Sequence, residues 1–258
     1  MSEGIQILPT PNTPEHREAV RRHNLRSNYL VPIYVMNTSN VPTEEAQAGF
    51  QGVMDAARAS GQRREVVNFG SERWVAGDYG SSDWYVEEAF RRQQFSRNLG
   101  HGPQLVTRSV TRLFIEEPWQ QNPHWEVFIV NRDLTSGEPD NNFVFGETNV
   151  DLRASVQSVT RLMNEVPRGQ LRLSMIRRLL AHEVGHMFGL PGRNYRVEQK
   201  LGLHCINICC MRQGMSIPEW AQLTQQEERS NIKFCNDCLN DLGRSAPRFR
   251  PLISTASS

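Results

Sequence analysis

The sequence predicts an α/β fold, and three observations support that prediction. Strand-like and helix-like segments alternate from about residue 30 onward, as is typical of a sheet covered by helices. Residues 171–189 carry apolar side chains at helical spacing and predict one long helix. All five cysteines lie between positions 205 and 238, so we expect a small C-terminal subdomain there. A length of 258 residues fits one large domain or two small ones.

The elements follow from the period of the apolar residues. Strands are expected at short apolar runs, at 30–36, 65–69, 125–130 and 143–145. Helices are expected where apolar residues recur at helical spacing, at 44–59, 85–99, 104–116 and 171–189. Residues 152–162 fit a strand or a helix, and the glycine- and serine-rich segment 70–83 is interpreted as a loop.

These elements predict four regions along the chain. Residues 1–28 are polar and contain three prolines, and we expect a flexible N-terminal arm there. An α/β subdomain over 29–190 includes the long helix, and the C-terminal subdomain covers 191–243. Residues 244–258 are rich in Pro, Ser and Arg and are predicted to be a disordered tail.

Composition excludes several classes of protein. The net charge is +1, whereas a nucleic-acid-binding protein is expected to show a basic excess. No apolar run approaches the ~18 residues of a membrane span, and the N-terminus lacks a secretory signal. We therefore expect a cytoplasmic protein with neither nucleic acid nor membrane as its partner. In a reducing compartment, a cysteine cluster that ends in C-x-x-C indicates metal ligands or a redox pair.

The predicted helix at 171–189 contains the sequence His-Glu-Val-Gly-His. Because His182 and His186 are four residues apart, both imidazoles lie on one helical face and can bind a single Zn²⁺ at ~2.0–2.1 Å. Glu183 lies one step round the helix, where it can accept a proton from a zinc-activated water that attacks a carbonyl. The pattern predicts a zinc-dependent peptidase that hydrolyses peptide bonds with Glu183 as the general base. Gly189 allows a left-handed helix end, after which the chain can return a third ligand.

A resemblance to a known family appears at the next histidine, His204, which Cys205 follows directly. The strings HEVGHMFGLP (182–191), HCINICCM (204–211) and FCNDC (234–238), in this order, resemble the archaemetzincins of the metzincin clan. The resemblance covers roughly 125–242. The metzincin pattern H-E-x-x-H-x-x-G-x-x-H places its third histidine at position 192, where this chain has glycine, and an insertion at 192–203 comes before His204.

The resemblance implies a metzincin-like twisted mixed sheet with a long active-site helix. It implies a zinc metallopeptidase whose catalytic zinc is held by His182, His186 and His204, with Glu183 as the general base. It also implies that Met211 is the methionine of the turn beneath this metal. An open fourth position is what distinguishes a catalytic zinc site from a structural one.

The resemblance implies a second, structural zinc in the C-terminal subdomain, so that two ions bind per chain. Its expected ligands are four cysteines, namely Cys205, Cys209, Cys235 and Cys238. Cys210 is an alternative to Cys209, because the spacing to Met211 favours Cys209 whereas the spacing from Cys205 favours Cys210. Four thiolates close a tetrahedral shell.

The substrate is expected to be a peptide or a protein. In metzincins the strand before the active helix is the edge of the sheet and pairs with an extended peptide, and the resemblance assigns this edge to Phe143, Val144 and Phe145. The alternative is that these residues form an ordinary core strand. Residues expected to line the cleft lie at 149–153, Arg193 and Arg196, while the five tryptophans are interpreted as packing residues.

Two other functions are compatible with the sequence. In a gluzincin-type zinc hydrolase a downstream glutamate is the third ligand, and the candidates are Glu198, Glu219, Glu227 and Glu228. The other is a non-catalytic binding module, in which the cysteine segment is a zinc ribbon beside a degenerate peptidase site. Replacement of His204 by alanine separates the first alternative from the archaemetzincin-like assignment, and replacement of Glu183 by glutamine separates the second.

Overall fold

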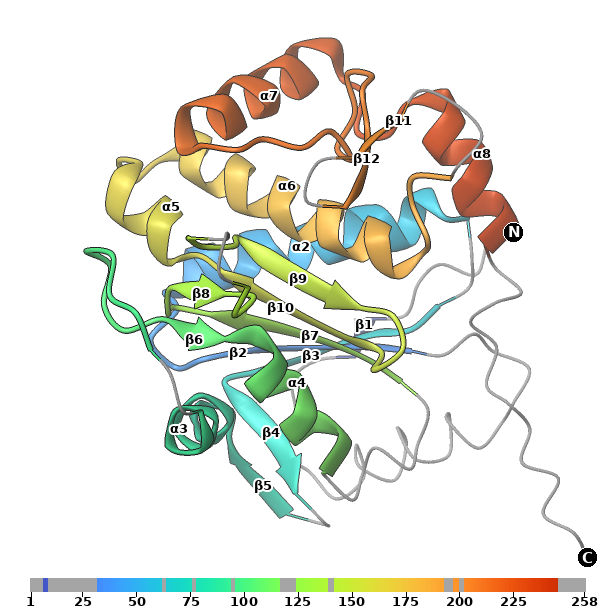
Figure 1. The fold of residues 1–258 in the computed structure, drawn as a ribbon. Helices are drawn as coiled ribbons and strands as arrows, with labels where there is room; N and C mark the ends of the chain where they lie inside the picture. The colour runs from blue at the N-terminus through green and yellow to red at the C-terminus, as the bar shows by residue number, and fades with distance from the viewer. Residues whose placement is uncertain are drawn as a thin grey trace, which may run out of the picture.

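The computed structural model describes residues 7–8, 32–61, 64–75, 78–93, 96–116, 124–138, 142–192, 197–199 and 202–245. Its centre is a six-stranded sheet in the order β1-β3-β2-β7-β10-β9, with helices on both faces (Figure 1). All neighbouring strands are parallel except β9, which pairs antiparallel with β10 at one edge. The predicted α/β fold with a mixed sheet is therefore confirmed.

The strands follow the apolar runs of the sequence. They are β1 (Ile7–Leu8), β2 (Ile33–Asn37), β3 (Val66–Gly70), β7 (Trp125–Val130), β9 (Gly146–Asn149) and β10 (Ala154–Ser158). Every residue of β7 is buried, because β7 is an interior strand between β2 and β10. Side chains alternate along it, so that Val127 and Ile129 enter the core on one face of the sheet while Phe128 and Val130 enter the core on the other.

One face of the sheet is covered by α2 (Thr43–Ala59), α5 (Thr160–Glu165) and α6 (Gln170–Met187) (Figure 1). Glycine allows α2 and α6 to approach closely, because a Cβ at Gly52 would collide with the Arg177 carbonyl oxygen. Apolar residues are distributed around most of the circumference of α6, and the helix is accordingly buried on nearly all sides. Its side chains are therefore held by the sheet below and by the C-terminal elements above.

The other face carries α3 (Asp83–Arg92), α4 (Thr107–Glu116) and the hairpin of β4 (Glu72–Val75) and β5 (Asp78–Ser81). Two short strands, β6 (Leu105–Val106) and β8 (Leu134–Thr135), pair beside them. The C-terminal part contains β11 (Val197–Gln199), β12 (Leu203–Cys205), α7 (Ile217–Ser230) and α8 (Asn236–Ser245). It lies over α6, on the side away from the sheet (Figure 1).

Several predicted boundaries were wrong. The segment 70–83 was expected to be a loop but contains the β4–β5 hairpin, because ERWV pairs locally across a short turn. The helix expected at 85–99 ends at Arg92, since the Gln93 side chain instead bonds to the backbone of Gln104 and Val106. Residues 152–162 contain both a strand, β10, and the start of a helix, α5.

The two predicted mobile ends lie largely outside the described residues. Within the predicted N-terminal arm, Ile7–Leu8 pairs with β3 as a strand, which contradicts an entirely loose arm at that point. Within the predicted tail, residues 244 and 245 belong to α8 rather than to a disordered segment. The division into subdomains at residue 190 stays a prediction.

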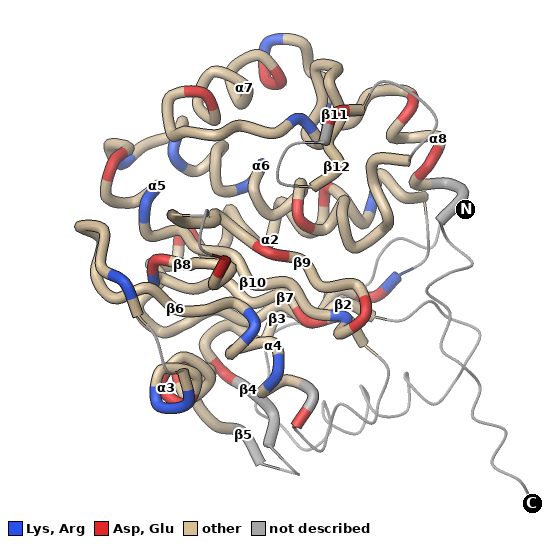
Figure 2. The backbone as a smooth tube through the Cα atoms, in the orientation of Figure 1, with Lys and Arg blue, Asp and Glu red and all other residues tan. Residues whose placement is uncertain are grey.

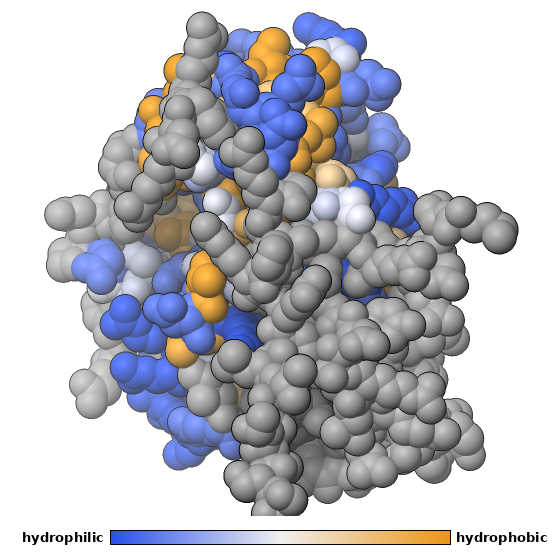
Figure 3. Space-filling model, turned by 90° about the vertical axis from the view of Figure 1, so that its right-hand side faces the viewer, coloured by the Kyte–Doolittle hydropathy of each residue, from blue (hydrophilic) through white to orange (hydrophobic). Residues whose placement is uncertain are grey.

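The surface of the described chain carries charges of both signs. Basic and acidic residues are interspersed along the tube in Figure 2, in keeping with the net charge of +1. Hydrophobic residues reach the surface in the upper part of Figure 3, where the C-terminal elements lie. Ile206, Ile208 and Leu239 are among the exposed apolar side chains of this part. Within the described ranges, none of the helices has the length and apolar character that a membrane crossing requires.

Candidate functional site

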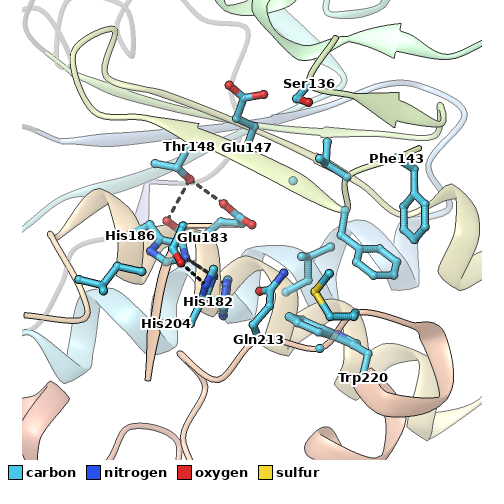
Figure 4. Close-up of a pocket in the computed structure, with 18 of the residues that line it drawn as sticks. Ser136, Phe143, Glu147, Thr148, His182, Glu183, His186, His204, Gln213 and Trp220 are labelled. Carbon is cyan, nitrogen blue, oxygen red and sulfur yellow. Dashed lines mark hydrogen bonds between the residues drawn. The ribbon is translucent and has the colours of Figure 1, made fainter. Parts of the chain in front are cut away.

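Three histidines converge above the sheet edge. Helix α6 provides His182 and His186, four residues apart on one face, and β12 provides His204. The Nε2 atom of His186 lies 3.1 Å from Nε2 of His182 and 3.3 Å from Nε2 of His204 (Figure 4). His204, which follows the insertion at 192–203, therefore lies beside the two histidines of α6.

Each of these imidazoles is oriented by a backbone carbonyl. Nδ1 of His182 contacts the Cys210 oxygen at 2.8 Å, and Nδ1 of His186 contacts the Leu190 oxygen at 2.8 Å. Nδ1 of His204 lies 3.2 Å from the Gly202 oxygen. Because a carbonyl only accepts hydrogen bonds, each Nδ1 carries the proton, and the lone pair of each Nε2 faces the shared centre.

The charge state of these histidines suits a metal. Burial and, to a smaller extent, the His204 imidazole together lower the pKa of His186 to about 4. Burial likewise holds the pKa of His182 well below its usual value. Both rings are therefore neutral near pH 7, which is the form that ligates a cation.

The geometry fits zinc. Nitrogen ligands at ~2.0–2.1 Å in a tetrahedral arrangement lie about 3.3 Å from one another. The two nitrogen–nitrogen distances of 3.1 and 3.3 Å agree with that separation. Three imidazoles and an open side toward a cavity form the donor set of a catalytic zinc site.

Glu183 lines the same cavity as the three histidines (Figure 4). Burial raises the pKa of its carboxyl group to about 7, while a hydrogen bond from Thr148 opposes that shift. The Thr148 hydroxyl donates to Oε2 of Glu183 at 2.8 Å. A buried carboxyl group with a pKa near neutrality is suited to accept and release a proton at physiological pH.

Met211 lies directly beneath the histidine site. A Cβ at Gly185, between the two histidines of α6, would collide with the Met211 sulfur. Only glycine allows the helix to lie so close to this methionine, which is fully buried. The structure therefore places Met211 in the position expected of the methionine in the turn beneath the metal.

Four cysteine sulfurs form a second cluster. The Sγ atoms of Cys205, Cys209, Cys235 and Cys238 all lie within 4.8 Å of one another. Those of Cys205 and Cys235 are 3.8 Å apart. Sulfur ligands at ~2.3 Å in a tetrahedral arrangement lie about 3.8 Å apart, so this cluster also fits zinc.

Backbone and amide groups donate to the cluster. The backbone N–H of Cys235 donates to Sγ of Cys209, and the Asn207 side-chain amide donates to Sγ of Cys235, each at 3.4 Å. Such donors stabilise negative charge on sulfur, as thiolate ligands require. The loop at 205–210 exposes Ile206 and Ile208 but buries its three cysteines.

Cys209 lies in the cluster and Cys210 does not. The Cys210 thiol points the other way and donates to the Arg178 backbone oxygen at 3.4 Å. Burial raises the pKa of Cys210 to about 12, which keeps this thiol protonated. The contribution of Cys210 to the site is its carbonyl oxygen, which orients His182, a role that the sequence does not indicate.

The histidine site opens into a cavity of about 730 Å³. It is bounded on one side by β9, and its apolar part includes Phe145, Leu179, Met215 and Trp220. Trp220, which was interpreted as a packing residue, is buried in the core, stacks on Phe145 with ring centroids 5.8 Å apart and also lines this cavity.

The predicted edge strand was wrong in position. The edge strand of the sheet is Gly146–Asn149, directly after Phe143, Val144 and Phe145. Val144 instead forms an isolated bridge with Leu134. The apolar run therefore leads into the edge and lines the cavity, whereas the more polar GETN pairs with β10. An edge strand has a neighbour on only one side, so apolar character does not identify it.

The other predicted cleft residues are only partly described. Val150 lines the cavity and is half exposed. Arg193 and Arg196 lie outside the described residues, as does half of the 192–203 insertion. Thr148, Gln213 and Met215 line the cavity although no motif in the sequence singled them out.

Glu198 lies opposite His204 in the pairing of β11 with β12, but none of the glutamates proposed as alternative ligands belongs to the histidine cluster of the described residues. Among the described residues, the histidine cluster consists of His182, His186 and His204 without a carboxylate. Glu219 accepts a hydrogen bond from the Met215 backbone, and Glu227 forms ion pairs with Arg178 and Lys233. The geometry favours a histidine over a glutamate as third ligand.

The sequence of the chain is similar to that of an archaemetzincin. It is 33% identical over 123 residues to Archaemetzincin of Methanopyrus kandleri, a match that takes in 46% of this chain and 56% of that protein. The alignment thus spans little more than half the length of this relative. No protein-family model matches the chain.

Solved structures extend the likeness to the fold. The crystal structure of Archaemetzincin from M. kandleri superposes with a TM-score of 0.56 at 20% identity, covering 85% of this chain and 97% of that one. A zinc-dependent peptidase from Methanocorpusculum labreanum gives a TM-score of 0.46 at 18% identity, over 81% of this chain and 99% of that one. The resemblance seen in the sequence is thereby confirmed: this chain is archaemetzincin-like in fold across most of its length, and in sequence over the 123 residues of the match.

Proposed function

We propose that this protein is a zinc-dependent peptidase. The observation that carries the proposal is the convergence of three Nε2 atoms, 3.1 and 3.3 Å apart, in a cavity that Glu183 also lines. The likeness to archaemetzincin in sequence and fold supports it. His182, His186 and His204 would hold the catalytic ion.

In this proposal, different residues of the chain have different roles in hydrolysis. A zinc ion held by the three histidines would supply an electrophile able to polarise the scissile carbonyl and acidify water. Glu183 accepts the proton that the attacking water gives up and donates it to the departing amine nitrogen. The carbonyls of Cys210, Leu190 and Gly202 hold the three imidazoles in the ligating tautomer.

The substrate in this proposal is an extended peptide. Strand β9 pairs with β10 along one side, and its other side borders the cavity. A peptide that adds to this edge binds through main-chain hydrogen bonds, so its affinity depends little on sequence. Selectivity then comes from the apolar part of the cavity, where Phe145, Leu179 and Met215 would contact one substrate side chain.

A second ion would bind the four clustered cysteines. Four sulfur ligands leave no open position, so this ion would be structural. It would fix the loop that carries Cys205, directly beside His204, and the Cys210 carbonyl that orients His182.

Zinc analysis and a peptide-library digest of the purified protein test the proposal together. We expect two zinc ions per chain and cleavage of unstructured peptides. Glu183→Gln is expected to retain both ions and to lose activity, because the amide cannot accept the proton. His204→Ala is expected to retain one ion. Cleavage that survives Glu183→Gln comes from another source and rejects the proposal, and a full histidine site in His204→Ala rejects the assigned ligands.

A further inference from the structure

We infer that the edge strand β9 positions the general base: Thr148 and Gly146 hold the Glu183 carboxylate in one orientation, with Thr148 as the positioning residue. The inference rests on the proposed function and adds to it a residue outside the zinc-binding motif. Both positions lie on the strand that borders the cavity, and Figure 4 shows Thr148 beside Glu183.

The contact between Thr148 and Glu183 is direct. The Thr148 hydroxyl donates to Oε2 of Glu183 at 2.8 Å and also lies 3.2 Å from the Glu183 backbone oxygen. It is a charge-assisted hydrogen bond when the carboxylate is ionised. The two residues are 35 positions apart in sequence, so only the packing of β9 on α6 creates the contact.

The Thr148 hydroxyl is itself held in place. Ser155 lies directly opposite Thr148 in the antiparallel pairing of β9 and β10, and their hydroxyl oxygens are 2.6 Å apart. This contact and the pairing of the two strands fix the position of the Thr148 hydroxyl oxygen. The side-chain amide of Gln157 in turn hydrogen-bonds the Ser155 hydroxyl.

These polar side chains are otherwise unexpected in the core. Ser155 and Gln157 are fully buried on the sheet face that packs against α6, where apolar residues are the rule. Burial of polar groups is tolerated when each has a hydrogen-bond partner. Their chain of contacts ends at Glu183, so a rigid, interior strand fixes the hydroxyl that orients the carboxylate.

Gly146 provides the space for the carboxylate. A Cβ at this position would lie 2.9 Å from both Cδ and Oε1 of Glu183 and 3.1 Å from Cγ of Gln157. Any side chain here would push Glu183 out of its orientation. Gly146 and Thr148 are two residues apart and therefore face α6 from the same side of β9.

The arrangement leaves the two carboxylate oxygens with different roles. Oε2 is engaged by Thr148, and Oε1, which lies over Gly146, is left as the oxygen for proton transfer. Without the Thr148 hydroxyl the carboxylate can rotate, and the fraction of molecules with Oε1 correctly placed falls. Zinc ligation and substrate pairing involve other atoms. Removal of the Thr148 hydroxyl should therefore slow the chemical step without weakening the binding of zinc or substrate.

The test compares Thr148→Val, which removes the hydroxyl at similar volume, with Thr148→Ser, which retains it. In the zinc-loaded full chain, we expect Thr148→Val to lower kcat about 10- to 100-fold, the range that one hydrogen bond to a charged group predicts. KM is expected to stay within about twofold of its original value, and Thr148→Ser is expected to recover most of kcat. Ser158→Ala is the matched control, since Ser158 is on β10 but its hydroxyl donates to the Arg132 oxygen.

A second measurement does not depend on activity. The carbon-13 resonance of the Glu183 carboxyl group, assigned by its absence in Glu183→Gln, is expected to shift in Thr148→Val and to return in Thr148→Ser. Zinc content and melting temperature of both variants are measured alongside, to show that fold and metal are intact.

The outcomes separate the two hypotheses. A wild-type protein that carries zinc and cleaves no peptide overturns the proposed function. An active wild type whose Thr148→Val variant retains its kcat, or whose carboxyl resonance is unchanged, overturns only the positioning role. If Thr148→Ser is as inactive as Thr148→Val while both are folded, the hydroxyl is not the group that matters, and the inference is rejected.

Discussion

The backbone oxygen of Cys210 lies 2.8 Å from Nδ1 of His182, and this contact links the cysteine cluster to the histidine site. Cys210 directly follows Cys209, whose sulfur belongs to the cluster, and precedes Met211 beneath the helix. The second link is covalent, because His204 and Cys205 are neighbours in β12. Any disorder in the cysteine loop is therefore transmitted to two of the three histidines.

This double link predicts that loss of a cysteine affects the distant metal. We expect Cys235→Ser to lose the ion of the cysteine cluster and also to weaken zinc binding by the histidines, since the loop that carries His204 and the Cys210 carbonyl loses its anchor. Zinc titration of the variant, monitored by metal analysis after dialysis, measures both sites.

Cys210→Ala is the matched control for this experiment. It removes a thiol outside the cluster while retaining the carbonyl that contacts His182. We expect it to keep two ions per chain. If the histidine site of Cys235→Ser remains as tightly bound as in the wild type, the two sites are independent.

Metal removal is expected to destabilise the C-terminal part first. Four sulfur atoms within 4.8 Å repel one another as thiolates unless a cation lies between them. An ion that binds only the folded state stabilises it, so a chelator should lower the melting temperature by about 10 °C. Thermal melts with chelator and after zinc is restored provide the measurement, and a melting temperature insensitive to both contradicts a structural ion.

Arg178 is predicted to contribute strongly to stability. It is almost fully buried, pairs with Glu227 at 3.1 Å, and donates to the Arg212 oxygen at 2.8 Å. Arg178→Met leaves a buried carboxylate without this partner, and we expect a loss of about 3 kcal/mol in the free energy of unfolding. Urea unfolding of the zinc-loaded protein measures the change.

The neighbouring residue Arg177 offers a control of the same chemical type. It pairs with Asp55 at 2.6 Å, but its side chain is 48% exposed. An exposed pair contributes little, so Arg177→Met should change the free energy of unfolding by less than ~1 kcal/mol. Equal losses in the free energy of unfolding for the two substitutions would contradict the prediction that burial makes the Arg178 ion pair the more important one.

Met215 is predicted to influence substrate selection rather than folding. It lines the apolar part of the cavity and is 40% exposed, so its side chain is available to a ligand. Met215→Ala should raise KM several-fold for peptides with a large apolar residue at the cleavage site, because about 1 kcal/mol of apolar contact is lost. Ile232→Ala, at an exposed residue that is not among those lining this cavity, should leave KM unchanged. An identical cleavage profile for Met215→Ala and wild type argues against this subsite.

Local patterns in the sequence were enough to predict the parts of the site that lie on one element. Helical spacing places His182 and His186 on the same face of α6, and no tertiary contact is needed to know it. The buried strand β7 was equally predictable, because an interior strand is apolar on both faces. The edge strand β9 was not, since pairing on one side alone imposes no apolar pattern on GETN.

Only the tertiary structure decided how distant segments meet. The approach of His204 to α6 across the insertion, the choice of Cys209 over Cys210, and the contact of Thr148 with Glu183 all join residues whose separation in sequence carries no distance information. The physical reason is the same in each case. Residue types determine which atoms are able to bind a metal or a proton, whereas backbone pairing and burial determine which of those atoms face one another.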